Sequence, residues 1–384
     1  NARDSLGAMA PTDAVYLINW FPGTTSVVQR YGYSQFSTGY GAADQVETLM
    51  NYYGASTNKF FAITTANKIY NITAGGAIGA ADVSSLTNAR FQYINVSTSA
   101  GNWLMAVNGA DKLRGYSGTT WYIDGDGSHD ITGIDTATCS QINLFKNRVW
   151  LVENNSLNVW YLPTSAIAGA ATAFPLLGIA TLGGYVIAMG TWTMDAGYGV
   201  DDMAVFITNM GELIVYKGTD PAAAATWTLV GVWRVGAPVG RRCFTKYGGD
   251  MILISKDGLL PMSAALQSDR IDQRASLTDK IQSAVNSAIT SYGSIFGWQV
   301  IQFPKQNMLV LNVPVEAGDN QEQYVMNSIT KSWCNFTGWE SNCWELFGDN
   351  LYFGGKGFVG KAWDTLADNA TNIATNGKQA FNYF

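Results

Sequence analysis

Short apolar segments, each followed by a tight turn and a second apolar segment, recur along most of the chain. The clearest copies are residues 203–208 with 213–216 and residues 251–255 with 259–262, joined in both cases across a turn that contains glycine. An apolar strand, a glycine turn and a second apolar strand are the signature of a β-hairpin. The pattern therefore predicts two antiparallel hairpins in this part of the chain.

The same unit recurs at a regular spacing elsewhere. Comparable first strands begin near residues 60, 103 and 149, and weaker copies begin near residues 308 and 351. With the two copies above, successive units begin about 43 to 57 residues apart. A repeat of this length with several strands is typical of β-propellers, in which each repeat forms one blade. We predict an all-β protein, a β-propeller-like ring of about six or seven irregular blades, and the alternative is a two-sheet sandwich with hairpins at chance spacing.

Two segments depart from the repeat. Residues 1–40 carry short apolar stretches and are predicted to form an N-terminal arm, which completes the last blade or clasps a neighbouring subunit. Residues 41–384 form the predicted propeller domain. Within it, Ser276–Asp279 has the form of a capping box, with Asp in place of the usual Glu or Gln, and apolar residues follow at helical spacing. We predict one inserted helix at 276–292, packed on the ring or on a neighbouring subunit.

Charged residues are scarce in this chain. They make up 14% of it, against about a quarter in a typical protein, while 47% of the residues are hydrophobic and 13% are aromatic. Strands generally use few Lys and Glu residues, but the composition also fits a surface that is covered by partners. We favour burial between subunits. The net charge of −6 argues against non-specific nucleic-acid binding through a broad basic face.

The four cysteines, Cys139, Cys243, Cys334 and Cys343, are too few for a disulfide scaffold and lack the spacing of a zinc site. We expect buried free thiols, with a Cys334–Cys343 pair across a hairpin as the alternative. No apolar run is long enough to predict a transmembrane helix, so no stable membrane insertion is expected. Because residue 1 is Asn and the last residues stop within a strand-like pattern, we expect the biological chain to extend beyond both ends.

A loop rich in glycine and aspartate carries the only histidine. Asp124, Asp126 and Asp130 place carboxylates at alternating positions, as in a calcium-binding loop. His129 stands where such a loop has glycine, and Asp135 stands where it has a bidentate glutamate. We predict a polar loop between strands and no metal or cofactor site, with a cation at the three carboxylates as the alternative.

One local cluster of basic residues is present, consisting of Arg234, Arg241, Arg242 and Lys246. Such a cluster could contact the acidic rim of a partner or a phosphate backbone. Four charges within a short segment are more typical of a solvated edge, and we predict that here.

The motifs of common enzyme classes are missing. With one histidine, serine or cysteine triads and multi-histidine metal sites lack their main component, and neither a phosphate loop nor a dinucleotide fingerprint is present. We predict no catalytic residues and no enzyme activity. Two alternatives remain open: a glycoside-cleaving propeller whose paired carboxylates meet in a central cleft, and a glycan-binding module that uses exposed tryptophans such as Trp121 or Trp339.

Two stretches carry a family resemblance. The first runs from Asp13 to Pro22 and continues at Arg30–Tyr33, and the second runs from Asp201 to Ser263, above all at Tyr216–Pro221 and Gly240–Phe244. Both resemble the tail hub or nozzle proteins of short-tailed bacteriophages, also called packaged-DNA stabilisation or tail tubular proteins. The resemblance spans most of the chain, and its motifs are structural.

The resemblance implies a propeller-containing subunit located in the virion, in the phage tail. Six copies would form a ring below the portal and adaptor connector proteins and would also contact tail fibre or spike proteins. The ring would enclose a channel that retains the packaged DNA and conducts it during ejection, without sequence-specific binding. A weakly charged, acidic lining suits such a channel, because phosphate contacts would hold the DNA back. The main hypothesis is therefore a non-enzymatic structural virion protein.

Overall fold

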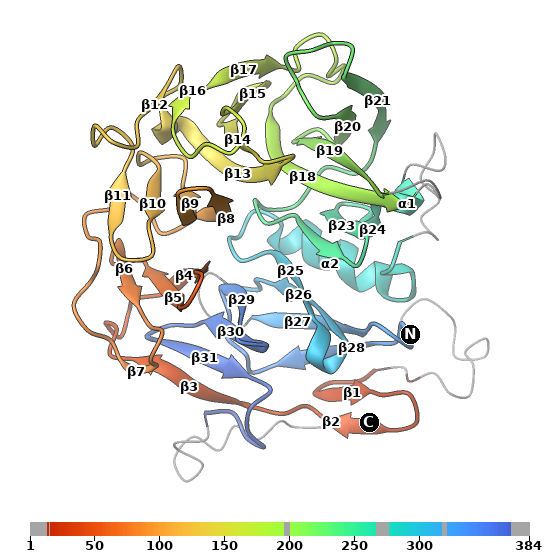
Figure 1. The fold of residues 1–384 in the computed structure, drawn as a ribbon. Coiled ribbons are helices and arrows are strands. Elements are labelled where there is room, and N and C mark those ends of the chain that lie inside the picture. The colour runs from red at the N-terminus through yellow and green to blue at the C-terminus, as the bar shows by residue number, and fades with distance from the viewer. Residues whose placement is uncertain (1–13, 15, 196–199, 266–275, 317–320, 370–384) are drawn as a thin grey trace.

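The computed structural model describes residues 14, 16–195, 200–265, 276–316 and 321–369, and these form a ring of antiparallel sheets around a central axis (Figure 1). Seven sheets surround the axis in chain order, so the protein is a seven-bladed β-propeller. This confirms the predicted all-β propeller. No described helix is long and apolar enough to cross a membrane.

The first four blades follow one another in chain order. Blade 1 contains β4 (Val46–Tyr53), β5 (Asn58–Thr64) and β6 (Lys68–Asn71). Blade 2 contains β8 (Gln92–Thr98), β9 (Gly101–Val107), β10 (Arg114–Tyr116) and β11 (Trp121–Ile123). Blade 3 contains β13 (Cys139–Phe145), β14 (Arg148–Glu153), β15 (Asn158–Tyr161) and β17 (Thr172–Pro175). Blade 4 contains β18 (Val186–Asp195), β19 (Val200–Thr208), β20 (Glu212–Gly218) and β21 (Trp227–Arg234).

The last three blades include the helices and the closure of the ring. Blade 5 contains β22 (Phe244–Tyr247), β23 (Asp250–Ser255) and β24 (Gly258–Pro261), followed by α1 (Met262–Ala265) and α2 (Gln282–Tyr292). Blade 6 contains β25 (Gln299–Phe303), β26 (Met308–Val313), β27 (Glu322–Asn327) and β28 (Trp333–Thr337). Blade 7 contains β29 (Cys343–Phe347), β30 (Asn350–Gly354), β31 (Phe358–Ala362) and β3 (Tyr33–Thr38), with the short β7 (Gly76–Ala77) beside β3.

Four short strands of the described residues lie outside the blades. The strands β1 (Trp20–Pro22) and β2 (Val27–Gln29) form a two-stranded sheet, and β12 (Ile131–Thr132) pairs in parallel with β16 (Gly169–Ala170). The β1–β2 sheet lies next to blade 6, since Ile18 forms a bridge with Asn335 of β28.

The repeated apolar segments of the sequence are the second strands of the blades, namely β5, β9, β14, β19, β23, β26 and β30. Side chains alternate between the two faces of a strand, and both faces of these strands pack against a neighbouring blade. In β5, Phe60 and Ala62 belong to the cluster shared with blade 7, whereas Phe61 and Ile63 belong to the cluster shared with blade 2. Burial on both faces explains why these strands are continuous apolar runs.

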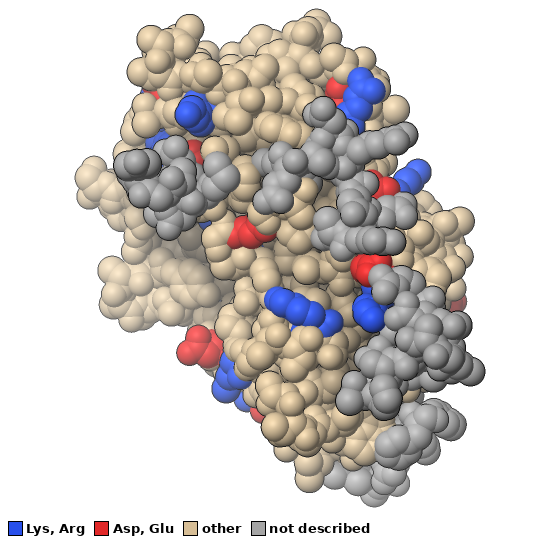
Figure 2. Space-filling model, turned by 90° about the vertical axis from the view of Figure 1, so that its right-hand side faces the viewer, with Lys and Arg blue, Asp and Glu red and all other residues tan. Residues whose placement is uncertain are grey.

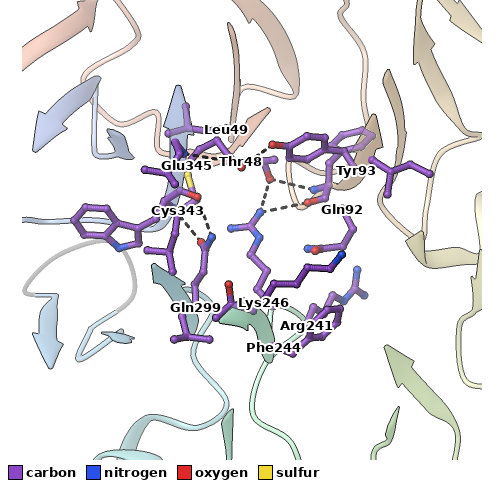
Figure 3. Close-up of a pocket in the computed structure, with 18 of the residues that line it drawn as sticks. Thr48, Leu49, Gln92, Tyr93, Arg241, Phe244, Lys246, Gln299, Cys343 and Glu345 are labelled. Atoms are coloured by element: carbon purple, nitrogen blue, oxygen red, sulfur yellow. Dashed lines mark hydrogen bonds between the residues drawn. The ribbon is translucent and has the colours of Figure 1, made fainter. Parts of the chain in front are cut away.

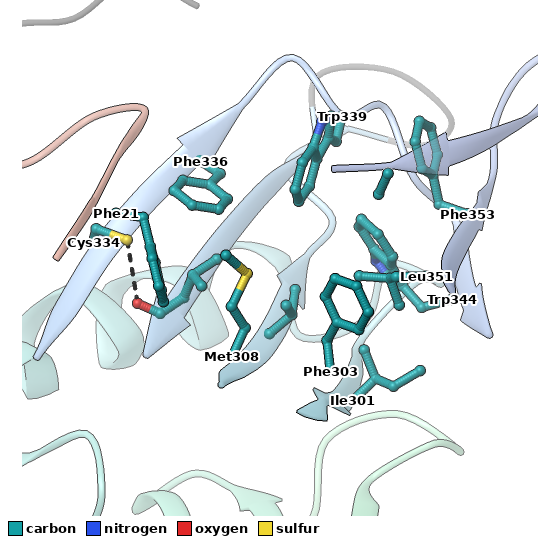
Figure 4. Close-up of a cluster of buried hydrophobic side chains, with 13 residues drawn as sticks. Phe21, Ile301, Phe303, Met308, Cys334, Phe336, Trp339, Trp344, Leu351 and Phe353 are labelled. Carbon is teal, nitrogen blue, oxygen red and sulfur yellow. Dashed lines mark hydrogen bonds between the residues drawn. The ribbon is translucent and has the colours of Figure 1, made fainter. Parts of the chain in front are cut away.

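Each pair of adjacent blades shares one hydrophobic cluster, and the cluster between blades 6 and 7 is the richest in aromatic residues (Figure 4). Trp339 and Trp344 lie at its centre with ring centroids 5.6 Å apart, and Phe353 packs against Trp344. Phe21 of β1 also enters this cluster. The N-terminal segment therefore contributes a side chain to the hydrophobic core between blades 6 and 7.

The ring is closed by pairing the two ends of the chain. β3 pairs antiparallel with β31, so residues 33–38 form the fourth strand of blade 7. Just before β3, the buried Arg30 forms an ion pair with Asp368 at 2.6 Å, and its guanidinium lies 4.9 Å from the ring centroid of Trp339. Of the two roles left open for the predicted arm, completion of the last blade is the one seen here.

The predicted helix is present, but its start differs. A 3₁₀ turn covers Asp279–Ile281 and α2 follows, so helical structure begins three residues later than expected. The prediction of a capping box was wrong. The Ser276 hydroxyl instead donates to the carbonyl of Leu259 in β24 at 3.1 Å. The buried face of α2 packs on blades 5 and 6 through Val285, Ala288 and Ile289, so the helix packs on the ring.

Candidate functional site

A cavity of about 470 Å³ lies on the axis, between the first strands of the blades. We call it the axial cavity, and its lining includes Thr48, Tyr93, Gln141, Arg242, Gln299 and Glu345. These residues come from six of the seven blades, and Figure 3 shows the labelled residues arranged around the central space. Its volume is in the range of sites for small molecules and is far too small for a nucleic-acid duplex.

Arg242 connects blade 5 to blades 1 and 2 at the wall of the cavity. Its Nη2 donates to Thr48 Oγ1 at 2.8 Å, to the Glu47 carbonyl at 3.0 Å and to the Phe91 carbonyl at 3.3 Å. Its Nη1 is buried and has no hydrogen-bond partner among the described residues. Burial lowers the pKa of Arg242. One half of the guanidinium is thus anchored, and the other half has no acceptor.

Glu345 is the acidic residue of the lining, and it comes from the first strand of blade 7. Its Oε2 accepts a hydrogen bond from the Tyr93 hydroxyl at 2.7 Å, and its Oε1 accepts from the Leu346 N–H at 2.9 Å. Desolvation raises the pKa of Glu345 to about 7, because burial disfavours its charged form more than these hydrogen bonds favour it. This carboxyl therefore changes its charge near neutral pH.

A second cavity lies beside the axial cavity, and two arginines meet an aromatic ring there. Arg90 pairs with Glu47 at 3.1 Å, and its guanidinium lies 4.3 Å from the ring centroid of Phe296. The guanidinium of Arg242 lies 5.4 Å from the same ring. Arg241 lines both cavities, and its Nη1 donates to the Asn108 carbonyl at 3.1 Å. Burial, followed by the charges of Arg90 and Arg242, lowers the pKa of Arg241.

The predicted basic cluster is therefore divided. Arg241, Arg242 and Lys246 line the axial cavity, whereas Arg234 lies at the end of the outer strand β21 and donates to the Thr181 hydroxyl at 3.1 Å. The prediction of a solvated edge was wrong for Arg241 and Arg242, because the segment before β22 turns inward to begin the inner strand of blade 5. The closeness of the four basic residues in the sequence did not indicate that this segment turns toward the axis.

The Asp loop makes hydrogen bonds within the protein. Asp124 is buried and accepts from the Ile131 N–H at 2.8 Å and from the Thr136 hydroxyl at 2.6 Å. Asp126 and Asp130 accept hydrogen bonds from backbone N–H groups of the same loop. Across the described residues, no group of three or more His, Cys, Asp or Glu side chains is placed to hold a metal ion. This is the arrangement of a polar loop between strands.

The histidine and the cysteines lie apart from the axial cavity, with one exception. His129 stacks on Tyr122 with ring centroids 4.1 Å apart, and Asp135 caps a 3₁₀ turn (Thr136–Thr138). All four cysteines are buried and free, as expected, and Cys343 is the one that lines the cavity. Burial raises its pKa to about 12, so it is a thiol at neutral pH.

The residues expected for the carbohydrate alternatives are placed differently. Trp339 is fully buried between blades 6 and 7, so its prediction as an exposed platform was wrong. Trp121 packs its ring against Phe61 and Tyr116. Among the described residues of the axial cavity, Glu345 is the single carboxylate, whereas glycoside cleavage by the usual route needs two. The polar part of the axial cavity is thus formed mainly by cationic and amide side chains.

The fold and the cavity define the class of protein, a seven-bladed β-propeller with a basic axial cavity. No protein-family model matches the chain, and no curated protein is significantly similar to it. Among solved structures, BBS1N from a complex with ARL6DN has a TM-score of 0.52 at 10% identity, over 88% of this chain and 99% of that chain. YCF48 from Cyanidioschyzon merolae has a TM-score of 0.46 at 10% identity, over 86% of this chain and 98% of that chain. The likeness to BBS1N shows the propeller fold alone.

Proposed function

We propose that this chain is a non-enzymatic structural protein of the virion of a short-tailed bacteriophage, a propeller subunit of the tail hub or nozzle. The proposal rests on the resemblance of two sequence stretches to such tail proteins. The observation in the structure that favours it most is the exposed apolar outer strand of blade 4. Such a strand suits a subunit that assembles with further copies.

The stretches that carry the resemblance belong to the framework of the ring. Arg30 is the buried partner of Asp368 at the closure, and Gly240–Phe244 leads into the inner strand of blade 5. Gly218 has a φ of +133°, and a Cβ atom there would lie 1.8 Å from the Thr226 carbonyl oxygen, so this turn into β21 requires glycine. Asp13 and Val15 lie outside the described residues. The shared positions are those that a common scaffold would need.

The strand β21 supports an oligomer. It is the edge of its sheet, and three apolar side chains are exposed there, Leu229 by 40%, Val230 by 41% and Val232 by 36%. Edge strands with exposed apolar residues tend to associate with other chains. We place the contact between neighbouring copies at this strand, in a homo-oligomer of six copies.

Sparse charge fits the same assembly. Figure 2 shows a face of the molecule on which charged side chains are few and scattered between uncharged residues. Interfaces are depleted in charged residues at their centre, so such a face is suited to burial between subunits. Because the axial cavity is too small for DNA, the proposed DNA channel lies between subunits, with the portal and adaptor connector on one side and tail fibres or spikes on the other. The DNA would pass without sequence-specific binding.

The mass of the purified chain, measured by light scattering and electron microscopy alone and with virion tails, tests the proposal. We expect a six-fold ring, or density for this chain in a short tail. A strictly monomeric particle that is absent from virions would overturn the proposal. In that case the alternative, a carbohydrate-binding or glycoside-cleaving propeller, would be tested with glycan arrays and glycosidase substrates.

A further inference from the structure

Two buried hydrogen-bond donors of the axial cavity have no acceptor. Arg242 Nη1 and Gln92 Nε2 both belong to side chains that line the cavity, and neither has a partner among the described residues. A buried donor without an acceptor is costly, and the cost is larger for a charged group. Both atoms also have almost no accessible surface, so a ligand in the cavity would contact them only after the two side chains rotate toward it.

The charges around the cavity favour an anion. Arg241, Arg242 and Lys246 line it, and Glu345 is the single carboxylate among the described residues of its wall. Arg90 also stands near Arg241, and the charges of Arg90 and Arg242 both act to lower the pKa of Arg241. Like charges so close to one another repel, and the nearby Glu47 is already paired with Arg90. Water could accept hydrogen bonds from these groups but would not neutralise them.

We propose that the axial cavity binds one small oxyanion between Arg241, Arg242 and Lys246, with the amide of Gln92 as a further donor. Carboxylate and phosphate or sulfate groups share the acceptor geometry that a guanidinium prefers. The volume of about 470 Å³ admits such an anion or a small molecule that carries one. Lys246 is the exposed member of the set and adds a charge that attracts anions toward the cavity.

This inference does not depend on the proposed function. The site lies within one copy of the propeller and uses inner-strand residues, whereas the assembly surface uses the outer strand of blade 4. A monomer would therefore bind the anion as well as a ring would.

Calorimetric titration with sulfate, at constant ionic strength set by chloride, tests the site. We expect saturable binding of one sulfate per chain. Gln92→Met removes an unpaired donor with little change in volume, and Lys246→Met removes an exposed charge. Each should weaken binding about tenfold, as expected for loss of a hydrogen bond or charge that meets an anion. Lys217→Met, which removes an exposed charge from β20 of blade 4, is the matched control and should bind sulfate like the wild type.

Parallel titrations with phosphate and acetate identify the preferred anion. Tighter binding of sulfate and phosphate would support a site for tetrahedral oxyanions. Tighter binding of acetate would support a site for a carboxylate. Absence of saturable binding for all three anions would overturn the proposal, as would unchanged affinity in both Gln92→Met and Lys246→Met. Arg242→Met is not used as a test, because it also removes the three hydrogen bonds of Nη2 and can impair folding.

Discussion

Blade 7 and blade 4 are built from similar strands but end differently. Blade 7 joins residues 343–362 to β3 from the other end of the chain, and every residue of β3 is at least half-buried. Blade 4 comes from one continuous segment, and most residues of its outer strand β21 are exposed. The outer strand, rather than the repeated hairpin, therefore distinguishes the part of the ring that closes the fold from the part that exposes apolar side chains.

The cost of closure explains the difference. Pairing β3 with β31 joins segments about 320 residues apart, and such a long loop is entropically unfavourable to close. The buried Arg30–Asp368 pair and the aromatic cluster around Trp339 offset that cost. Blade 4 needs no such support, because neighbouring strands along the chain form its sheet.

The largest expected effect is the loss of the ion pair at the closure. Arg30→Met leaves Asp368 buried without its partner, and we expect the free energy of unfolding to fall by about 3–5 kcal/mol. Denaturant unfolding followed by tryptophan fluorescence measures the loss, because Trp339 lies beside Arg30.

Lys146→Met is the matched control for this substitution. It removes the Lys146–Asp202 pair between blades 3 and 4, which is about one-third exposed on both sides, and should cost at most about 1 kcal/mol. Equal losses in the two variants would show that the closure is no stronger than other junctions of the ring.

A smaller change in stability is expected when the pH is raised, because Glu345 on the inner strand of blade 7 loses its proton. The pKa of Glu345 rises from 4.5 to about 7 in the fold, so the folded state holds its proton more tightly than the unfolded state does. Its contribution to stability is full below about pH 4.5 and is lost as the pH rises through about 7, a loss on the order of 1–3 kcal/mol.

The neighbours of Glu345 allow this step to be isolated. Tyr93 and Tyr53 have raised pKa values and stay protonated in that range, and a guanidinium such as that of Arg242 is not deprotonated in proteins. Unfolding measured from pH 4.5 to 8 should show the loss in the wild type and lack it in Glu345→Gln. A loss of the same size in Glu345→Gln would assign the pH dependence to other groups.

The sequence predicts the features that depend on neighbouring residues, but not those that depend on residues far apart in the chain. The seven second strands were found because burial on both faces makes each one a local apolar run, as in residues 251–255. The pairing of β3 with β31 was left open, because the alternation within a strand does not specify a partner so distant in sequence. Trp339 could not be assigned to the core, since aromatic residues occur both inside and on binding surfaces. The axial position of Arg241 and Arg242 depends on the direction of a loop, for which the sequence carries no periodic signal.

Substitution of an exposed apolar residue in β21 should have the smallest effect on stability and the largest effect on assembly. A register shift between Val215 and Tyr216 leaves Val230 as the extra residue of a β-bulge, exposed by 41%. Bulges disfavour simple addition of a strand at an edge, so we expect neighbouring copies to meet through apolar side chains. Val230→Lys should change the free energy of unfolding by no more than about 0.5 kcal/mol, because no ladder pairing or core contact is lost.

Val230→Lys should also lower the mass of the proposed oligomer in light scattering, because a charge would have to be buried between subunits. Ile329→Lys, an exposed apolar residue in the turn between β27 and β28, is the control and should leave the mass unchanged. If both variants assemble like the wild type, the contact between copies lies elsewhere on the ring. If Val230→Lys unfolds the chain instead, β21 is part of the framework, and the contrast between blade 4 and blade 7 no longer holds.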